Sequence, residues 1–471
     1  MDPETNNAAL AARYDAIAYA ALPHPLTHPD RLATIATFLG IAAPAVATCR
    51  VLEVGCNDGS NLIPMAVGLP AAQFTGCDLS PRALDAGRRL VAELGLANVT
   101  LVEEDLTSLA PAHGNFDFII AHGVYSWVPA HVRDGLFALA AQRLAPNGVM
   151  FVSFNALPGS RVRQAAWEML HFHVDRIADP RARLDAVRRF ARMLATGSEN
   201  AHASDEALRA ELRAIAQRSD SELYHDDLAV PNDPVYISDF IAHAGRFGLR
   251  YLAEAELHTM SGAGISAEAK AFLSAQTAAE REQYLDFVRI RRFRQSLLVR
   301  HDAARDPASH PARVSAMHVA ADPSLLRAAA EGKVAQIARD LDPAAGGGGP
   351  VRKMLEALIA QSPATLPLAD LQAQMGAQGQ GRPLTATLTD AFVSGIVTLH
   401  VHPPRPAHEA GPNPEASPLA RHEARTRDAV TTLLHTRVAL PDANARQLLA
   451  LLDGTRDRAA LAAAMAGPAL R

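Results

Sequence analysis

The sequence has few cysteines, few lysines and few aromatic residues, and it lacks any long apolar run. Since no stretch of about 18 apolar residues occurs, we expect no membrane insertion. Residues 1–10 include acids but no basic segment, which argues against a signal peptide. Cys49, Cys56 and Cys77 fit no zinc spacing, and their odd number indicates a reducing compartment. We therefore expect a cytoplasmic protein without a metal site.

Positive charge comes almost entirely from arginine, because lysine occurs only at positions 270, 333 and 353. The net charge of −5 gives no general attraction to nucleic acid or to acidic lipid. Residues 289–294 form an arginine-rich run at the end of a predicted charged helix. One interpretation of this run is a patch that binds nucleic acid. The favoured interpretation is a helix surface whose arginines pair with nearby acids. We expect no nucleic-acid partner.

A hydrophobic content of 49% with 20% charged residues predicts a globular protein, and 471 residues exceed one ordinary domain. From about residue 46 onward, strand and helix patterns alternate. This alternation predicts an α/β fold with a Rossmann-like doubly wound sheet. Strands are expected at 51–54, 74–77, 99–102, 116–121 and 149–154.

The most informative stretch is an apolar strand that ends in the turn Gly55-Cys56-Asn57-Asp58-Gly59. Asp78 follows the next predicted strand, where a carboxylate can accept both hydroxyls of a ribose. The dinucleotide fingerprint G-x-G-x-x-G is incomplete here. Glu53 and Asp58 also place two acids where a pyrophosphate would lie, and they would repel it. A cationic ligand suits these acids, so the stretch predicts S-adenosyl-L-methionine as the cofactor.

The ends of successive parallel strands share one crevice, and this crevice is expected to hold the whole cofactor. The glycine turn can receive the methionine portion, and Leu79 can supply an apolar face. Asp105 can accept from the adenine amino group while Leu106 packs on the ring. The predicted cofactor-binding residues are Glu53, Gly55, Cys56, Asn57, Asp58, Gly59, Asn61, Asp78, Leu79, Asp105, Leu106 and His122.

The segment 122–129 follows the fourth predicted strand, where the methyl group would be presented. Transfer of a methyl group depends chiefly on positioning and desolvation, and aromatic faces attract a sulfonium or an ammonium. Core packing is the alternative for both aromatic residues of this segment, as it is for the tyrosines of the N-terminal arm. The candidate catalytic residues are Tyr125, Trp127, His122 and Tyr14, with Tyr19 as a second tyrosine of the arm.

Glycine and proline clusters divide the rest of the chain. Gly346–Gly349 and the proline-rich segment 403–417 are expected linkers. Helices near 351–362, 367–376 and 384–394, followed by a strand at 395–402, give the outline of a winged helix. The expected parts are an arm over the cofactor site (1–45), a cofactor-binding domain (46–160), a helical middle domain (161–300), a winged-helix-like domain (301–403), and a linker with a C-terminal helical segment (404–471).

Several of these segments resemble a known family, the class I methyltransferases that carry a methyltransferase regulatory domain. Bacterial protein-lysine methyltransferases that modify outer-membrane proteins belong to it. The resemblance extends over nearly the whole chain. It rests on residues 14–15, 27–32, 61–66, 122–129, 151–155, 158–159, 283–287, 292–295 and 452–456.

The resemblance implies a Rossmann-like catalytic domain, a middle domain that shapes the substrate cleft and a winged-helix-like C-terminal domain. It also implies methylation of an amine in a protein or peptide, with lysine as the first candidate, and commonly a homodimer. Residues 453–456 are similar to small peptide-binding winged helices, so a ribosomal precursor peptide is a second candidate substrate. A small metabolite stays open, as does a non-catalytic regulatory protein whose C-terminal domain recognises a partner or DNA.

Overall fold

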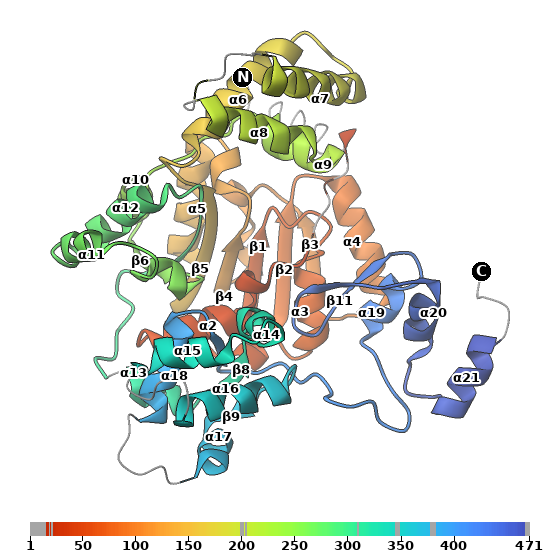
Figure 1. The fold of residues 1–471 in the computed structure, drawn as a ribbon. Coiled ribbons are helices and arrows are strands. Elements are labelled where there is room, and N and C mark those ends of the chain that lie inside the picture. Colours follow the sequence, from red (N-terminus) through yellow and green to blue (C-terminus); the bar gives the residue numbers. More distant parts are fainter. Residues whose placement is uncertain are drawn as a thin grey trace.

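The structure is a computed structural model that describes residues 16–17, 19, 22–197, 202, 205–308, 310–343, 349–376 and 383–466. A central sheet is flanked by helices, a helical cap lies above it, and two further parts lie below and beside it (Figure 1). Within these described ranges, no helix is long and apolar enough to cross a membrane.

The central sheet has the strand order β3-β2-β1-β4-β5-β7-β6. The strands β1 to β5 pair in parallel, which confirms the predicted doubly wound pattern. Their carboxyl ends therefore share one edge of the sheet. These parallel strands are β1 (Arg50–Val54), β2 (Gln73–Asp78), β3 (Val99–Glu103), β4 (Phe116–Ala121) and β5 (Leu144–Asn155).

Helices connect the parallel strands, as the alternation of strand and helix patterns predicts. They are α3 (Leu62–Gly68), α4 (Pro81–Glu93) and α5 (Ala130–Arg143), and they follow α2 (Pro29–Phe38) of the arm. The start of α4 is fixed by Ser80, whose hydroxyl accepts a hydrogen bond from the Ala83 N–H at 3.2 Å. Gly95, with φ +64°, takes the left-handed conformation that ends this helix.

Two antiparallel strands that the sequence did not predict extend the sheet beyond β5. These strands are β6 (Leu249–Glu254) and β7 (Phe293–Arg300), with α10 (Ile237–Arg246), α11 (Ala267–Ser274) and α12 (Ala278–Arg289) beside them. The prediction of a helix through residues 289–294 is wrong. The helix α12 ends at Arg289, because Ile290 turns the chain with φ +48° and β7 begins shortly afterwards.

The predicted pairing of the arginine run with acids is confirmed at Arg294, which is 1% exposed. Its Nη1 lies 2.6 Å from Glu254 Oε1, and its Nη2 lies 2.8 Å from Asp286 Oδ1 and 3.1 Å from Glu282 Oε2. This ion cluster joins β6, β7 and α12. A buried arginine of this kind needs its carboxylate partners, because an unpaired charge is costly inside a protein.

Residues 161–227 form the helical cap over the carboxyl edge of the sheet (Figure 1). Its elements are α6 (Arg161–Val174), α7 (Pro180–Thr196), α8 (Glu206–Ala216), α9 (Asp220–Glu222) and the π-helical turn Leu223–Asp227. Asp227 is fully buried and fixes this turn, since it accepts hydrogen bonds from Trp167 Nε1 at 3.0 Å and from Arg163 Nη2 at 2.9 Å. The turn is thereby held against α6.

Residues 310–400 form a domain below the sheet that combines helices with a small antiparallel sheet of order β10-β8-β9. Its elements are α13 (His310–Val314), β8 (His318–Ala321), α14 (Pro323–Ala330), α15 (Val334–Leu341), α16 (Gly349–Gln361), β9 (Leu366–Pro367), α17 (Leu368–Met375), α18 (Leu384–Val393) and β10 (Val397–His400). It packs on α2, where His400 Nδ1 lies 2.7 Å from Asp30 Oδ2. One apolar core runs from the central sheet through α2 into this domain.

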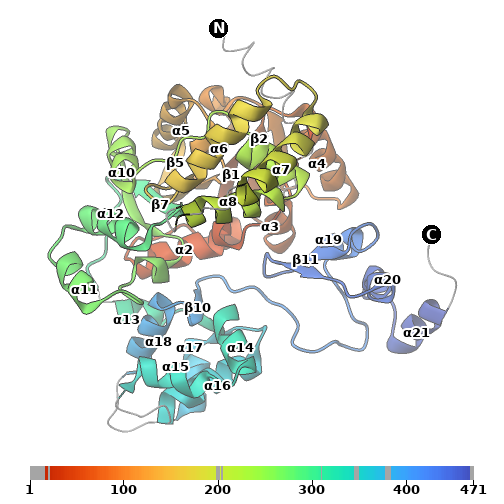
Figure 2. The ribbon, with the colours of Figure 1, turned by 45° about the horizontal axis from the view of Figure 1, so that its top comes forward.

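The C-terminal residues 418–466 form a separate small domain, which we call the hairpin domain. It contains α19 (Pro418–Glu423), β11 (Ala429–Thr431), β12 (Arg437–Ala439), α20 (Ala443–Leu451) and α21 (Arg458–Ala466). The sequence predicted a helical segment here; its three helices are present, but β11 and β12, which were not predicted, pair as an antiparallel hairpin. In both ribbon views the hairpin domain lies beside α3, and Figure 2 shows it apart from α14 to α17 (Figures 1 and 2).

Candidate functional site

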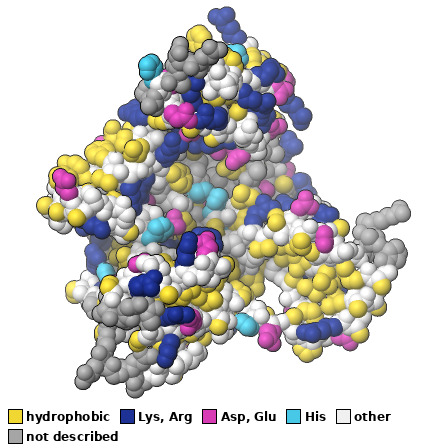
Figure 3. All heavy atoms as spheres, viewed as in Figure 1, with side chains coloured by type: hydrophobic (Ala, Val, Ile, Leu, Met, Phe, Trp, Pro, Cys, Tyr) yellow, Lys and Arg dark blue, Asp and Glu magenta, His cyan; other side chains and the backbone are white. Residues whose placement is uncertain are grey.

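A cavity of about 980 Å³ opens at the carboxyl edge of the sheet, between the glycine turn and the helical cap. It appears as a hollow in the centre of the face in Figure 3, with histidine side chains inside it. Its lining comes from β-strand ends, from the arm and from the cap, so segments far apart in the sequence meet there. This is the place where ligands bind in open α/β sheets.

Most of the predicted cofactor-binding residues line this cavity. They are Glu53, Gly55, Cys56, Asn57, Asp58, Asn61, Asp78, Leu79, Asp105, Leu106 and His122. Gly59 is not part of the lining. It closes the turn instead, with φ +75° and with its N–H donating to the Cys56 carbonyl at 2.9 Å.

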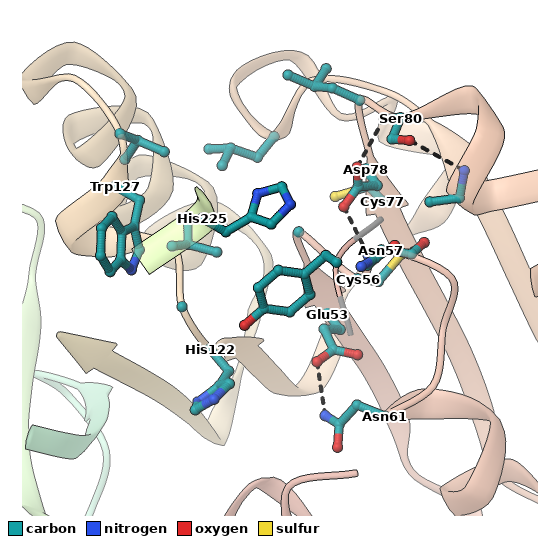
Figure 4. Close-up of a pocket in the computed structure, with 18 of the residues that line it drawn as sticks. Glu53, Cys56, Asn57, Asn61, Cys77, Asp78, Ser80, His122, Trp127 and His225 are labelled. Atoms are coloured by element: carbon teal, nitrogen blue, oxygen red, sulfur yellow. Dashed lines mark hydrogen bonds between the residues drawn. The ribbon is translucent and has the colours of Figure 1, made fainter. Parts of the chain in front are cut away.

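The candidate catalytic residues separate into different places. Trp127 lines the cavity, opposite Asp78 and Ser80 (Figure 4). The structure does not bring Tyr125 to the cavity, because its side chain is 2% exposed and its hydroxyl lies 2.8 Å from His243 Nδ1. Tyr19 of the arm lines the cavity. Tyr14 lies outside the described residues.

The glycine turn is shaped by an asparagine in a conformation that glycine usually supplies. Asn57 has φ +51°, in the left-handed region that asparagine tolerates better than most residues. Its N–H donates to Asp78 Oδ2 at 2.8 Å, and the Ser80 N–H donates to Asp78 Oδ1 at 2.9 Å. The carboxylate at the end of β2 is thus held in place by backbone donors.

Two further glycines, which the sequence did not single out, let this turn lie close to its neighbours. A Cβ on Gly87 of α4 would lie 2.3 Å from the Asp58 carbonyl oxygen. A Cβ on Gly76 of β2 would lie 2.6 Å from Cys56 Sγ. Both distances are too short for real atoms, so these positions require glycine.

Glu53 carries an unusual carboxyl group in the floor of the cavity. It is 4% exposed, and its Oε1 accepts a hydrogen bond from Asn61 Nδ2 at 2.8 Å. Burial raises the pKa of Glu53 to about 8, with Asp78 and Asp58 adding to the effect and the Asn61 hydrogen bond opposing it. Its Oε2 has no hydrogen-bond partner among the described residues. Once this carboxyl group has lost its proton, its buried, unpartnered oxygen beside the cavity suits the cationic amino group of S-adenosylmethionine.

Two histidines in the cavity add no positive charge to it. His24 and His122 stack with ring centroids 3.8 Å apart. Burial lowers the pKa of His24 to about 4 and that of His122 to about 3. Both imidazoles are therefore neutral near neutral pH. Their neutrality suits a cation, and the low pKa makes His122 a weak base.

The cap contributes residues that sequence reasoning missed. His225 and Asp226 of the π-helical turn line the cavity, and His225 points into it between Trp127 and Asp78 (Figure 4). The lining of the cavity also includes Asn155 and Phe293. The polar run Tyr224–Asp227, within an arginine- and alanine-rich helical region, is the signal that could have indicated them. Single π-helical turns are frequent at functional sites.

The cysteines beside the cavity are not suited to nucleophilic chemistry. Cys56 and Cys77 are buried, and burial raises the pKa of the Cys77 thiol to about 12 and that of Cys56 well above its usual range. Such thiols are poor nucleophiles. In the described part of the chain, no group of three or more histidine, cysteine, aspartate or glutamate residues could hold a metal ion.

Family models match three parts of the chain. A methyltransferase domain matches residues 51–148, a predicted methyltransferase regulatory domain matches 219–300, and a PKMT C-terminal winged helix domain matches 413–470. The winged-helix match lies C-terminal to residues 301–403, for which the sequence predicted such a module.

Two similar proteins come from Rickettsia prowazekii. An uncharacterized protein of Rickettsia prowazekii is 36% identical over 61% of this chain and 53% of its own length. The chain thus spans about half the length of that relative. A second uncharacterized protein of this species is 31% identical over 49% of this chain and 93% of its own length.

The fold is also found in a solved structure. PKMT2 from Rickettsia typhi, in complex with AdoHcy, has a TM-score of 0.79 and 24% identity, over 94% of this chain and 90% of that chain. The cavity at the strand ends, the strand order and these matches all indicate the same family. The chain belongs to the class I S-adenosylmethionine-dependent methyltransferases, in the group that carries a methyltransferase regulatory domain and a PKMT C-terminal winged helix domain.

Proposed function

We propose that this protein transfers a methyl group from S-adenosylmethionine to the side-chain amine of a lysine in a protein or peptide. The observation that carries the proposal is a partly buried carboxyl group, Asp226, in the wall of the same cavity that contains the glycine turn and Asp78. The cavity thus holds one set of acids suited to the cofactor and another acid suited to a second cation. A lysine side chain is such a cation, and its amine becomes a nucleophile once it has lost a proton.

Asp226 has the chemistry to bind an ammonium and to take up its proton. Burial raises the pKa of Asp226 to about 6, with Asp227 and Glu222 adding to the effect and Arg163 opposing it. Near neutral pH the group is mostly ionised, yet its pKa is much closer to that pH than the pKa of an ordinary aspartate. A general base works best with such a value.

S-adenosylmethionine, when bound, supplies an electrophilic methyl group on a sulfonium. Trp127 can attract a cation to its ring face, and the neutral His122 and His24 add no charge that would oppose it. Asp226 can orient the substrate amine and accept its proton. The helical cap excludes water from one side of the cavity, which favours an uncharged nucleophile.

A polypeptide substrate is supported by the form of the site and by the family match at 413–470. The hollow is bordered by the cap, the sheet and the domain below it, and it is open on the face seen in Figure 3. A side chain can enter such a hollow while its backbone stays outside. An enzyme for a small metabolite more often encloses its substrate completely.

Transfer of tritiated methyl groups tests this proposal. The protein is incubated with tritiated S-adenosylmethionine and a lysate, and the protein fraction is then hydrolysed and separated into amino acids. Label in methylated lysine is expected. Label only in small molecules, or in another amino acid, would refute lysine as the substrate. Binding of the cofactor without any transfer would support the non-catalytic alternative. A synthetic precursor peptide, with and without its lysines, separates the peptide from the protein substrate.

A further inference from the structure

The tip of the C-terminal hairpin reaches the floor of the cofactor cavity. His435, in the loop between β11 and β12, is 4% exposed. Its Nε2 lies 2.8 Å from Oδ1 of Asn61, the residue that donates to Glu53. Asn61 and Glu53 both line the cavity. A chain of hydrogen bonds therefore runs from the hairpin domain through Asn61 to Oε1 of Glu53, whose other carboxyl oxygen is the unpartnered one.

The hydrogen-bonding groups of this chain have a definite orientation. The backbone N–H of His24 lies 2.8 Å from Asn61 Oδ1, and since an N–H can only donate, this oxygen is the acceptor. His435 Nε2 must then donate as well, so its imidazole carries the proton on Nε2. Burial lowers the pKa of His435 well below its usual value, with His28 and His24 adding to the effect, which keeps the ring neutral.

The hairpin tip is built to hold the imidazole in one position. The His435 N–H donates to the Thr432 carbonyl at 3.0 Å, and the Thr432 N–H donates to the Thr436 carbonyl at 2.8 Å. His435 itself has φ +56°, a left-handed conformation that is costly for histidine. Such strain persists only where the surroundings enforce it. The side chain is thereby directed at Asn61.

The hairpin domain also touches the cofactor-binding domain outside the tip. Helix α19 contacts α3, the helix that begins immediately after Asn61. His422 Nδ1 lies 3.3 Å from Glu93 Oε2 at the end of α4. The domain is therefore seated on the two helices that flank the glycine turn, and His435 is the part of it that reaches inside.

We propose that the hairpin domain is part of the cofactor site, with His435 as a positioning residue that holds Asn61 and Glu53 ready for the amino-acid end of S-adenosylmethionine. This rests on S-adenosylmethionine being the ligand of the cavity. The coupling is reciprocal. If docking of the hairpin domain strengthens cofactor binding, then bound cofactor strengthens docking of the domain by the same free energy. A partner that occupies the hairpin domain can thus change the affinity of the enzyme for its methyl donor.

Calorimetry on the full chain tests this proposal with two ligands. His435→Gly removes the imidazole without strain, because glycine adopts φ +56° readily. The variant is expected to bind S-adenosylmethionine roughly tenfold more weakly, the effect of losing one hydrogen bond to a buried network. It should bind 5′-methylthioadenosine, which has no amino-acid end, as the unaltered protein does. Leu434→Ala, a change at an exposed side chain of the same loop, is the control and should change neither.

Two further measurements separate positioning from folding. His435→Gln keeps a donor at about the reach of Nε2, so it should recover most of the affinity. Proteolysis within the linker 403–417 should be slowed by S-adenosylmethionine in the unaltered protein and not in His435→Gly. Equal affinity of His435→Gly and the unaltered protein for S-adenosylmethionine would overturn the inference. So would an equal loss of affinity for both ligands. If the unaltered protein bound no S-adenosylmethionine, the cofactor assignment itself would fall.

Discussion

The substitution Glu53→Gln is expected to stabilise the protein while it weakens the binding of S-adenosylmethionine. In the unfolded chain this carboxyl ionises at its ordinary value near 4.5, but in the folded protein its pKa is about 8. The folded state therefore keeps a proton that the unfolded state has lost. Stability falls as the pH rises between these two values, and it stops falling above pH 8.

The size of each effect follows from the same pKa difference. Each unit is worth about 1.4 kcal/mol, so the buried carboxyl costs up to about 5 kcal/mol of stability near pH 8, before relaxation of the site reduces it. Glutamine has no such cost, and its amide oxygen can still accept from Asn61. The substitution weakens cofactor binding, because glutamine cannot offer a charged acceptor to the amino group of S-adenosylmethionine. A hydrogen bond to a charged group contributes about 1.5–3 kcal/mol, or roughly 10- to 150-fold in Kd.

Thermal melting and calorimetry at about pH 6 and about pH 8 measure both effects. The unaltered protein should gain affinity for the cofactor as the pH rises, because Glu53 must lose its proton before it can bind an ammonium. The ligand amine also titrates near pH 8, and Glu53→Gln shows that contribution alone. Asp85→Asn, at an exposed ion pair on α4, is the matched control. A variant that melts lower than the unaltered protein near pH 8, or that binds the cofactor equally well, would refute the reasoning.

Three other substitutions probe the turn, the ion cluster and the substrate amine. Gly87→Ala should displace the glycine turn, because its Cβ would lie 2.3 Å from the Asp58 carbonyl oxygen. The Kd for the cofactor should rise at least tenfold. Gly245→Ala, with open space around it, is the control and should leave this Kd unchanged. Arg294→Met should cost about 3–5 kcal/mol in urea unfolding, since it leaves buried carboxylates unpaired, and a loss below about 1 kcal/mol would contradict this. Asp226→Asn should lower kcat about 100-fold and remove the acid limb of the pH–rate profile near 6, with the cofactor Kd unchanged. The exposed Asp220→Asn is its control, and an unchanged profile for Asp226→Asn would exclude the proposed role.

The glycine turn shows how far a local pattern can be followed. The sequence shows that Asn57 and Asp58 lie between the two glycines of the turn, but it does not show which conformation they adopt. The structure shows that Asn57 simply adopts the left-handed conformation and donates to Asp78. The room for the turn comes from Gly76 and Gly87, which lie in other elements. A turn sequence indicates its own dihedral angles, but not the surface against which it packs.

The catalytic candidates show where such patterns stop. Trp127 and Tyr125 lie two positions apart in a short 3₁₀ turn, and the sequence treated them alike. The structure turns Trp127 to the cavity and Tyr125 to the core, where it packs against Phe137 and Phe240. The packing of distant helices decided between them.

The sequence by itself determined the parallel half of the sheet, the strand-end acids and the glycine turn, because periodicity and capping act over a few neighbouring residues. It did not determine β6 and β7, since antiparallel strands inserted after a helical region carry no local signal of their partner. Asp226 and His435 depended on the tertiary structure alone. Asn61 and His435 are 374 positions apart, and a hydrogen bond across that distance exists only because the hairpin domain docks beside α3.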